Sequence, residues 1–162
     1  MKITSLVLVM CLFIPYLALA QANLDAEEET KKIFPSLQKY DMESRIVDSQ
    51  EFKIFTVFAN DDIIGWAVIL DEMGKVKPIT FMVGIDKEGE VLEVRVLEYR
   101  EMRGRQIKRR SFLRQFKGKT IKSLLRIGRD IDAVTGATIS SEAVAAAVKK
   151  SLKIVEYLST KP

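Results

Sequence analysis

The sequence predicts an α+β domain in which an antiparallel sheet of two hairpins packs with helices, and three observations lead to this fold class. Two pairs of segments rich in β-branched and aromatic residues are each joined by a short polar turn. A charged segment near the N-terminus has helical character. A long segment with helical periodicity follows the hairpins near the C-terminus. The order of these segments places all the helices outside the run of strands.

Four segments are predicted to be strands: residues 52–58, 63–70, 79–85 and 91–97. The first two are joined by Asn60-Asp61-Asp62, and the last two by Asp86-Lys87-Glu88-Gly89, which are turn-forming sequences. In the last strand, apolar and charged residues alternate imperfectly. This pattern suits a sheet with one covered face.

Three segments are predicted to be helical. Residues 23–39 carry acids before bases, as suits the helix dipole, and Pro35 ends or kinks the helix, which we expect to dock at the edge of the domain. Residues 108–116 suit a short helix. Residues 141–158 repeat apolar side chains at spacings of three and four, with Ser140 as the expected N-cap.

The first twenty residues predict a signal peptide, so that residues 21–162 form a single exported domain. Lys2 precedes an uncharged apolar stretch that ends in Ala18-Leu19-Ala20, a small-x-small cleavage pattern. The alternative is an uncleaved membrane anchor, because the stretch is almost long enough to span a bilayer. Both interpretations place the domain outside the cytoplasm.

The scarcity of cysteine and histidine excludes several kinds of chemistry. The only cysteine, Cys11, lies in the predicted signal peptide, and the chain has no histidine. The mature domain therefore has no disulfide, no iron–sulfur cluster, no ordinary haem or zinc site and no Ser-His-Asp machinery. We expect no metal site, and any redox chemistry must come from an organic cofactor.

Thr135-Gly136-Ala137-Thr138 lies just before the long predicted helix. A helix N-terminus offers unpaired N–H groups and the positive end of a dipole, so it accepts a phosphate well. Thr138 places a hydroxyl at that position. From spacing alone, however, a simple turn and helix cap explains the same residues better, because short Gly/Thr strings are common.

The segment from Asp132 to Thr138, followed by Ile139-Ser140-Ser141, resembles the flavinylation motif of the FMN-binding domain family. Members include the C subunit of the sodium-pumping NADH:quinone reductase and the G subunit of the Rnf complex. The resemblance implies that Thr138 receives FMN from FAD as a phosphoester, made by an exported, magnesium-dependent flavin transferase of the ApbE type. It implies a cofactor site formed by these residues: Thr138, Asp132, Thr135, Gly136, Ala137, Ser140, Glu101 and Gly104.

The resemblance extends over roughly residues 25–158, with one departure. Further segments similar to the family are Lys32-Ile33-Phe34-Pro35, Val83 to Gly89 with residues 91–97, and Phe112 to Lys119. Where the family commonly has Glu-Thr-Pro-Gly-x-Gly, this chain has Glu101-Met102-Arg103-Gly104-Arg105-Gln106, in which Glu101 and Gly104 match. In the family this loop lies near the flavin, so the surroundings of the ring are expected to differ here.

Thirteen Lys or Arg lie between Arg95 and Arg129, against only Glu98 and Glu101. This stretch is interpreted as a solvated basic face, as a docking face for a redox partner, or as a source of arginines near the flavin phosphate, with Arg103 and Arg105 the candidates. Nucleic acid is disfavoured, because the chain carries an export signal and no recognisable nucleic-acid fold.

Two functions from different classes follow, with a third ranked below them. The first is an electron carrier that shuttles electrons between redox donor and acceptor proteins associated with the membrane. The second is a binding module without flavin, which uses its basic face to dock a partner or an anionic surface. The third, a flavin reductase, ranks lower because no acid/base pair stands out.

Overall fold

The computed structural model describes residues 25–160, which fall into two compact units divided after Pro35. The predicted signal peptide or anchor, residues 1–20, lies outside the described residues. In the first unit, residues 25–33 are helical, and the helix ends before Pro35 and not at the predicted residue 39. Among the described residues, no helix is both long and apolar enough to cross a membrane.

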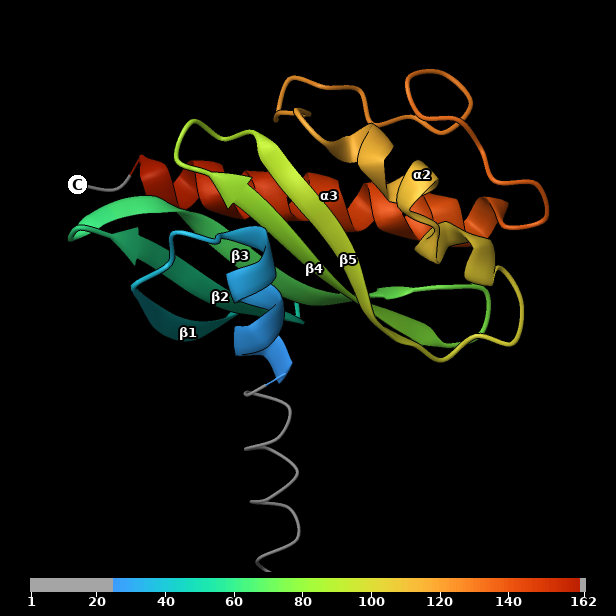
Figure 1. Ribbon diagram of the computed structural model, residues 1–162. Helices are drawn as coiled ribbons and strands as arrows, with labels where there is room; N and C mark the ends of the chain where they lie inside the picture. The colour runs from blue at the N-terminus through green and yellow to red at the C-terminus, as the bar shows by residue number, and fades with distance from the viewer. Residues whose placement is uncertain (1–24, 161–162) are drawn as a thin grey trace, which may run out of the picture. The chain divides into compact units, whose positions relative to one another are not determined.

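The second unit is built on a five-stranded antiparallel sheet in which each strand pairs with its neighbours in sequence (Figure 1). The strands are β1 (Lys39–Val47), β2 (Gln50–Ala59), β3 (Asp62–Met73), β4 (Pro78–Asp86) and β5 (Val91–Tyr99). Both predicted hairpins are present, as β2–β3 and β4–β5. Sequence reasoning missed β1, because this edge strand has no buried side chain and therefore lacks a clear apolar pattern.

Two-residue turns join the first three strands. Asn60 and Asp61 connect β2 to β3 with φ of +51° and +63°, and Asp48 and Ser49 connect β1 to β2 with similar values. Positive φ at both central positions is the geometry of a type I′ turn, which matches the twist of the flanking strands. Asp62, predicted as part of the turn, is instead the first residue of β3.

The helices after the sheet differ from the prediction in two respects. In place of one helix at 108–116 there are three short turns: η1 (Arg105–Lys108), α2 (Arg110–Leu113) and η2 (Arg114–Phe116). Arg109 interrupts them with an extended backbone, ψ 132°. The long helix α3 (Thr138–Ser159) begins at Thr138 rather than at 141, so its N-cap is Ala137 and not Ser140.

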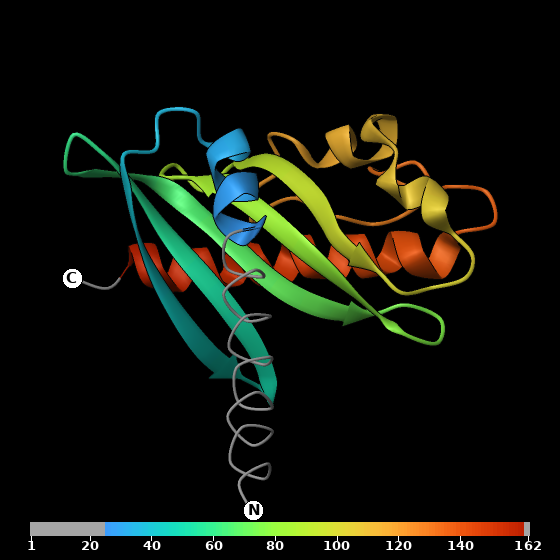
Figure 2. The same ribbon diagram turned by 60° about the horizontal axis from the view of Figure 1, so that its bottom comes forward.

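The helix α3 packs along one face of the sheet, against β3, β4 and β5 (Figures 1 and 2). Its buried side chains share a three- and four-residue spacing: Val144, Ala147, Val148, Leu152 and Val155. Alternate residues of β4 meet them, and Ile107, Phe112 and Phe116 of the short turns complete the same core. Each large side chain buried in this way contributes about 1.5–3 kcal/mol. The packing therefore fixes where the first turn of α3 lies relative to β5.

Candidate functional site

A tight turn leads the chain into α3. The amide of Ala137 donates a hydrogen bond to the carbonyl oxygen of Val134 at 2.9 Å, which closes a turn with Thr135 and Gly136 at its centre. Gly136 has φ of +75°, a conformation that suits the third position of a type II turn and favours glycine. Both central residues are exposed. The turn presents Thr138 as the first residue of the helix.

The start of α3 has no side-chain cap, and the side chain of Thr138 is exposed there. The first hydrogen bond inside the helix joins the amide of Ser141 to the carbonyl oxygen of Ala137, at 2.8 Å. The preceding amides of the first turn lack acceptors within the helix, as in any α-helix. These amides and the dipole of a 22-residue helix favour an anion beside the Thr138 hydroxyl.

The loop after β5 lies directly against this helix start through Gly104. A Cβ atom at Gly104 would lie 2.8 Å from the hydroxyl oxygen of Tyr99, 2.9 Å from Oγ of Ser140 and 3.5 Å from Cβ of Ala137. Gly104 also has φ of +90°. No other residue fits this contact without displacing its neighbours. The structure thus brings Gly104 together with Ala137 and Ser140.

Tyr99, which sequence reasoning did not place in the site, joins the loop to the helix. Its hydroxyl donates a hydrogen bond to the carbonyl oxygen of Arg103 and lies 3.3 Å from Oγ of Ser140. Ser140 is only 5% exposed, so its hydroxyl serves this contact instead of capping the helix. The position of Tyr99 at the end of a strand was the only available signal for this role.

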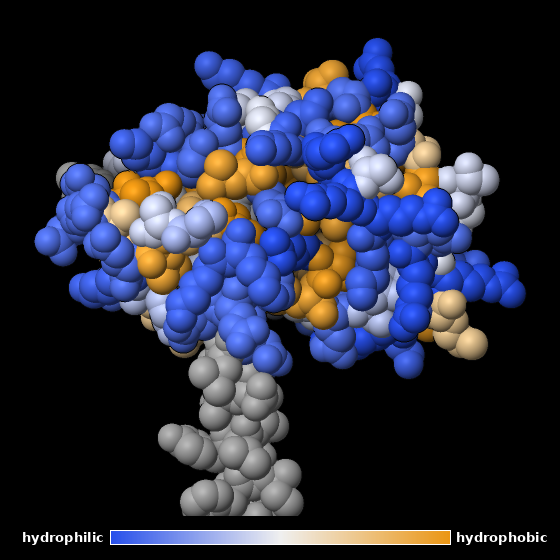
Figure 3. Space-filling model, viewed as in Figure 1, coloured by the Kyte–Doolittle hydropathy of each residue, from blue (hydrophilic) through white to orange (hydrophobic). Residues whose placement is uncertain are grey.

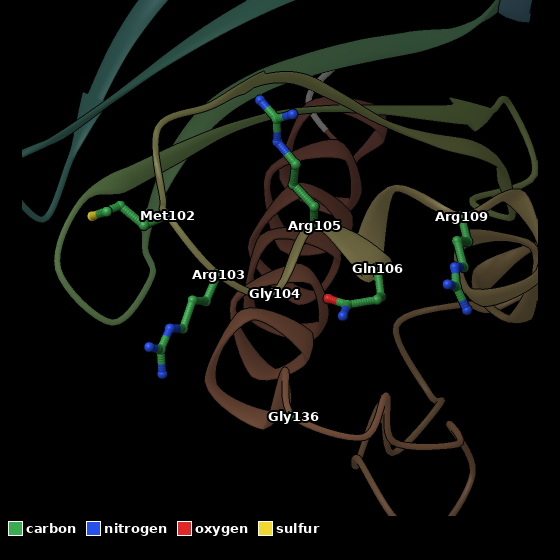
Figure 4. A pocket seen from close by; sticks show the side chains of 7 residues that line it. All are labelled: Met102, Arg103, Gly104, Arg105, Gln106, Arg109 and Gly136. Carbon is green, nitrogen blue, oxygen red and sulfur yellow. The ribbon is translucent and has the colours of Figure 1, made fainter.

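An open hollow of about 580 Å³ lies between this loop and the turn before α3 (Figure 4). Its lining residues are Met102, Arg103, Gly104, Arg105, Gln106, Arg109 and Gly136. Figure 4 shows the side chains of Arg103, Gln106 and Arg109 spread around the space near Gly136, whereas Arg105 extends toward the strands in this view. The lining holds three guanidinium groups and no carboxylate, which makes it suited to an anion.

Two of these arginines, Arg103 and Arg105, were predicted from their position beside Gly104, and Arg109 was not. Arg109 reaches the hollow because η1 turns the chain back before the extended residue 109. The basic run marked the region in the sequence. It could not indicate which members of the run face the hollow, since that depends on where the short helical turns break.

Glu101 points away from the hollow, toward the turn between β3 and β4. Its carboxylate accepts hydrogen bonds from the backbone amides of Val76 and Lys77, at 2.5 and 3.0 Å. These bonds hold the pKa of Glu101 below its ordinary value, and Lys77 adds a smaller effect of the same sign. Glu101 thus braces the loop that carries Gly104, and it is absent from the lining of the hollow.

Asp132 and the loop before it are held by separate hydrogen bonds. The amide of the exposed Asp132 donates to Oε1 of Gln115 at 2.7 Å, which ties the segment to η2. The carboxylate of Asp130 accepts from the amides of Arg126 and Leu125 at 2.7 and 2.9 Å, and these bonds lower its pKa. Within residues 25–160, no cluster of three or more potential ligands suits a metal ion.

Comparisons with known proteins bear on the same region. Residues 74–153 match the family model of the FMN-binding domain, a span that includes the Gly104 loop and the Thr138 segment. The G subunit of the ion-translocating oxidoreductase complex of Shewanella oneidensis is 35% identical over 85 residues, which cover 46% of this chain and 40% of the relative. The matching region thus spans less than half of that relative's length.

The crystal structure of Shewanella oneidensis NqrC has a similar fold. Its TM-score is 0.54 at 17% sequence identity, and the match covers 78% of this chain and 70% of that chain. At this identity the likeness concerns the fold alone. The predicted family and the predicted α+β architecture are confirmed.

Proposed function

Residues 74–153 of this chain belong to the FMN-binding domain family, and from this premise we propose that the protein is an exported electron carrier with FMN held on Thr138 as a phosphoester. The observation that carries the proposal is the position of the Thr138 hydroxyl. It lies exposed at the uncapped start of α3, two residues after Gly136, which lines the hollow together with three arginines; Thr138 itself is not one of the lining residues. Amides and guanidinium groups on two sides suit the charge of a phosphate.

The surrounding residues fit such a group. Gly104 and Gly136 leave backbone without side chains at the loop and at the turn, and Tyr99 with Ser140 keeps the two segments in contact. Asp132, Thr135 and Ala137 set the path of the chain into the helix. When bound, FMN supplies the electron-accepting and electron-donating chemistry, and the protein holds and orients it.

Attachment requires a separate enzyme. The Thr138 hydroxyl oxygen would bond to the FMN phosphorus of FAD as the pyrophosphate bond breaks, AMP would leave, and the hydroxyl proton would pass to the transferase. The residues around the hollow are Arg, Gln, Gly and Met, none of which is suited to remove that proton at neutral pH. An exported flavin transferase of the ApbE type is therefore the proposed partner.

The proposed setting is the periplasm or the outer face of the cytoplasmic membrane, with donor and acceptor proteins associated with that membrane. Residues 1–20 have the pattern of an export signal, or of an anchor that is kept. The relative from Shewanella oneidensis is a subunit of an ion-translocating oxidoreductase complex, which supports membrane-associated redox partners.

The test is to express the chain with a flavin transferase and to measure its intact mass and its in-gel flavin fluorescence after denaturation. We expect a mass gain of one FMN that disappears in Thr138→Ala. Thr135→Ala is the matched control, because Thr135 is also an exposed threonine in the same segment. A gain that persists in Thr138→Ala and disappears in Thr135→Ala moves the attachment site. No gain in the presence of an active transferase contradicts the proposal.

The alternative is a binding module without flavin, and the three arginines of the hollow are the observation that favours it. In that case the hollow would accept an anionic group of a partner directly. The same mass measurement separates the two functions, because a binding module gains no FMN.

A further inference from the structure

One continuous surface of the molecule is strongly cationic, and it contains the hollow beside Thr138. Residues 102–129 contain no Asp or Glu and eleven Lys or Arg. Lys119 pairs with Asp130, at 3.7 Å. The other ten are exposed, and no ion pair joins them to a described residue: Arg103, Arg105, Lys108, Arg109, Arg110, Arg114, Lys117, Lys122, Arg126 and Arg129. We call these ten residues the cationic face.

The short helical turns η1, α2 and η2 and the loop that follows carry this face. In Figure 1, α2, η2 and the loop that follows lie above the first half of α3, whereas η1 lies near the start of that helix. Figure 3 shows many strongly hydrophilic residues over the same region, with apolar residues in smaller groups. Buried Ile107, Phe112 and Phe116 anchor the short turns to the core. The backbone of the short turns is therefore held against the core, with its cations on the outer side.

Unpaired cations in such number repel one another, which lowers the stability of the folded protein. An acidic partner bound to this surface would offset the repulsion. Neighbouring surfaces of the same chain show the contrast: Arg45, Arg95 and Arg100 each pair with a carboxylate two residues away. Lysines elsewhere, such as Lys149 and Lys153, also have no ion pair with a described residue, but ten such cations gather around the hollow and the short turns.

We propose that the cationic face docks an acidic electron-transfer protein, so that the redox group of that partner approaches the FMN carried on Thr138. The inference rests on the proposed function. Opposite charges steer encounter and orient the two proteins, and this effect is strongest where the charged surface surrounds the site that must be reached. Gly136 and three cations of the face line one hollow, so docking there brings the partner to the flavin.

A membrane surface is the less suitable occupant. Proteins that bind at a bilayer surface place Trp, Phe or Leu among the cations, for insertion below the headgroups. In residues 102–129, which the structure describes throughout, the only exposed large apolar side chains are Met102 and Leu124. Both phenylalanines of the segment are buried. An acidic protein needs no such insertion.

The test uses the flavinylated protein, whose FMN content is first verified by mass. Reduced plant-type ferredoxin, an acidic one-electron donor, is mixed with the oxidised protein in a stopped-flow instrument. Two reduced ferredoxins lose one electron each to reduce one FMN, and protons come from solvent. We expect the second-order rate constant to fall about tenfold or more from low to high salt. Reduced protein should show no such fall with mammalian cytochrome c, a basic acceptor.

Two double variants distinguish an effect of the cationic face on the reaction rate from an effect of the protein's net charge. Arg110→Gln with Arg114→Gln removes two cations of the face that lie outside the lining of the hollow, so the lining itself stays unchanged. Lys149→Gln with Lys153→Gln removes two exposed cations of α3. We expect the first variant to slow reduction by ferredoxin about threefold to tenfold at low salt, with an unchanged flavin potential, and the second to leave the rate unchanged.

Equal slowing in both variants would mean that only net charge matters, and the proposal would fall. It would fall as well if neither variant slows the reaction. A third arm mixes each protein with vesicles of phosphatidylglycerol and phosphatidylethanolamine. Vesicle binding that is lost in the Arg110/Arg114 variant, with ferredoxin rates unchanged, assigns the face to the membrane and overturns the proposal.

Failure of the proposed function can be distinguished from failure of the docking proposal. If the protein gains no FMN, the proposed function fails, and the docking proposal is then decided by retention of the flavin-free chain on immobilised ferredoxin. Salt-sensitive retention that is lost in the Arg110/Arg114 variant and kept in the Lys149/Lys153 variant supports an acidic partner, and absence of retention overturns it.

Discussion

The hydroxyl oxygen of Tyr99 lies 3.3 Å from Oγ of Ser140, and the same hydroxyl donates a hydrogen bond to the carbonyl oxygen of Arg103. Tyr99 ends β5 and Ser140 lies in the first turn of α3. This contact therefore joins the sheet, the arginine-bearing loop and the helix start at one point. The stability of that junction can be tested by substitution.

Replacing Tyr99 by Phe removes both contacts of the hydroxyl while keeping the ring. We expect the free energy of unfolding to fall by about 1 kcal/mol, as for a typical hydrogen bond, and the amide of Gly104 to exchange with solvent faster. Urea denaturation and hydrogen exchange measure these effects. Ser140→Ala keeps the bond to Arg103, so its cost should be smaller. Unchanged exchange at Gly104 in Tyr99→Phe would contradict the role of the contact.

Replacing Gly104 by Ala should destabilise the protein more than the same change at Gly118. Both glycines have positive φ, +90° and +73°, so both substitutions strain the backbone. Only at Gly104 would the new Cβ meet atoms closer than 3.0 Å. We expect an additional loss of about 1–3 kcal/mol at Gly104, from overpacking. Equal losses in thermal or urea denaturation would show that the loop moves freely away from α3.

The pKa of Glu101 predicts a pH-dependent stability. Because hydrogen bonds from Val76 and Lys77 lower this pKa from about 4.5, the charged form is favoured in the folded state. The stabilisation is thus present above the unfolded-state pKa and is lost as the pH falls through the lower, folded-state value. Glu101→Gln should be less stable than the wild type at neutral pH.

The difference in stability between the wild type and Glu101→Gln should shrink below about pH 4.5, where the carboxylate begins to take up its proton in the unfolded chain. Denaturation curves collected across this range check the sign. Glu142→Gln is the matched control, because Glu142 is exposed on α3. A difference between wild type and Glu101→Gln that grows toward acid pH would contradict the prediction.

Asp130 is predicted to hold closed the loop that precedes the turn into α3. Its carboxylate binds the amides of Leu125 and Arg126, and Leu125 has φ of +51°, an unfavourable conformation that these bonds maintain. Asp130→Asn should raise the rate of trypsin cleavage after Arg126 and Arg129 several-fold, because the loop opens more often. Asp132→Asn changes a neighbouring exposed carboxylate and should leave cleavage unchanged. Similar digestion of all three proteins would show that the loop is held by other contacts.

The hairpins and the long helix could be predicted from the sequence because each has a strong local signal. Asn60 and Asp61 permit the positive φ of a tight turn, and the apolar residues of α3 repeat at helical spacing. The strand β1 could not be predicted, since this edge strand buries no side chain and so needs no apolar pattern. Ser140 was assigned the cap because serine is a good cap by propensity, but tertiary packing buries it beside Tyr99.

The sequence by itself determined the fold class and the FMN-binding family, because these depend on local patterns and on a motif of consecutive residues, and it led to the proposal for Thr138. Only the tertiary structure decided that Glu101 braces a turn, that Arg109 lines the hollow with Arg103, and that Tyr99 meets Ser140. These relationships join residues far apart in the chain. They arise because burial of one face of the sheet against α3 sets the position of both partners at once, which no local pattern encodes.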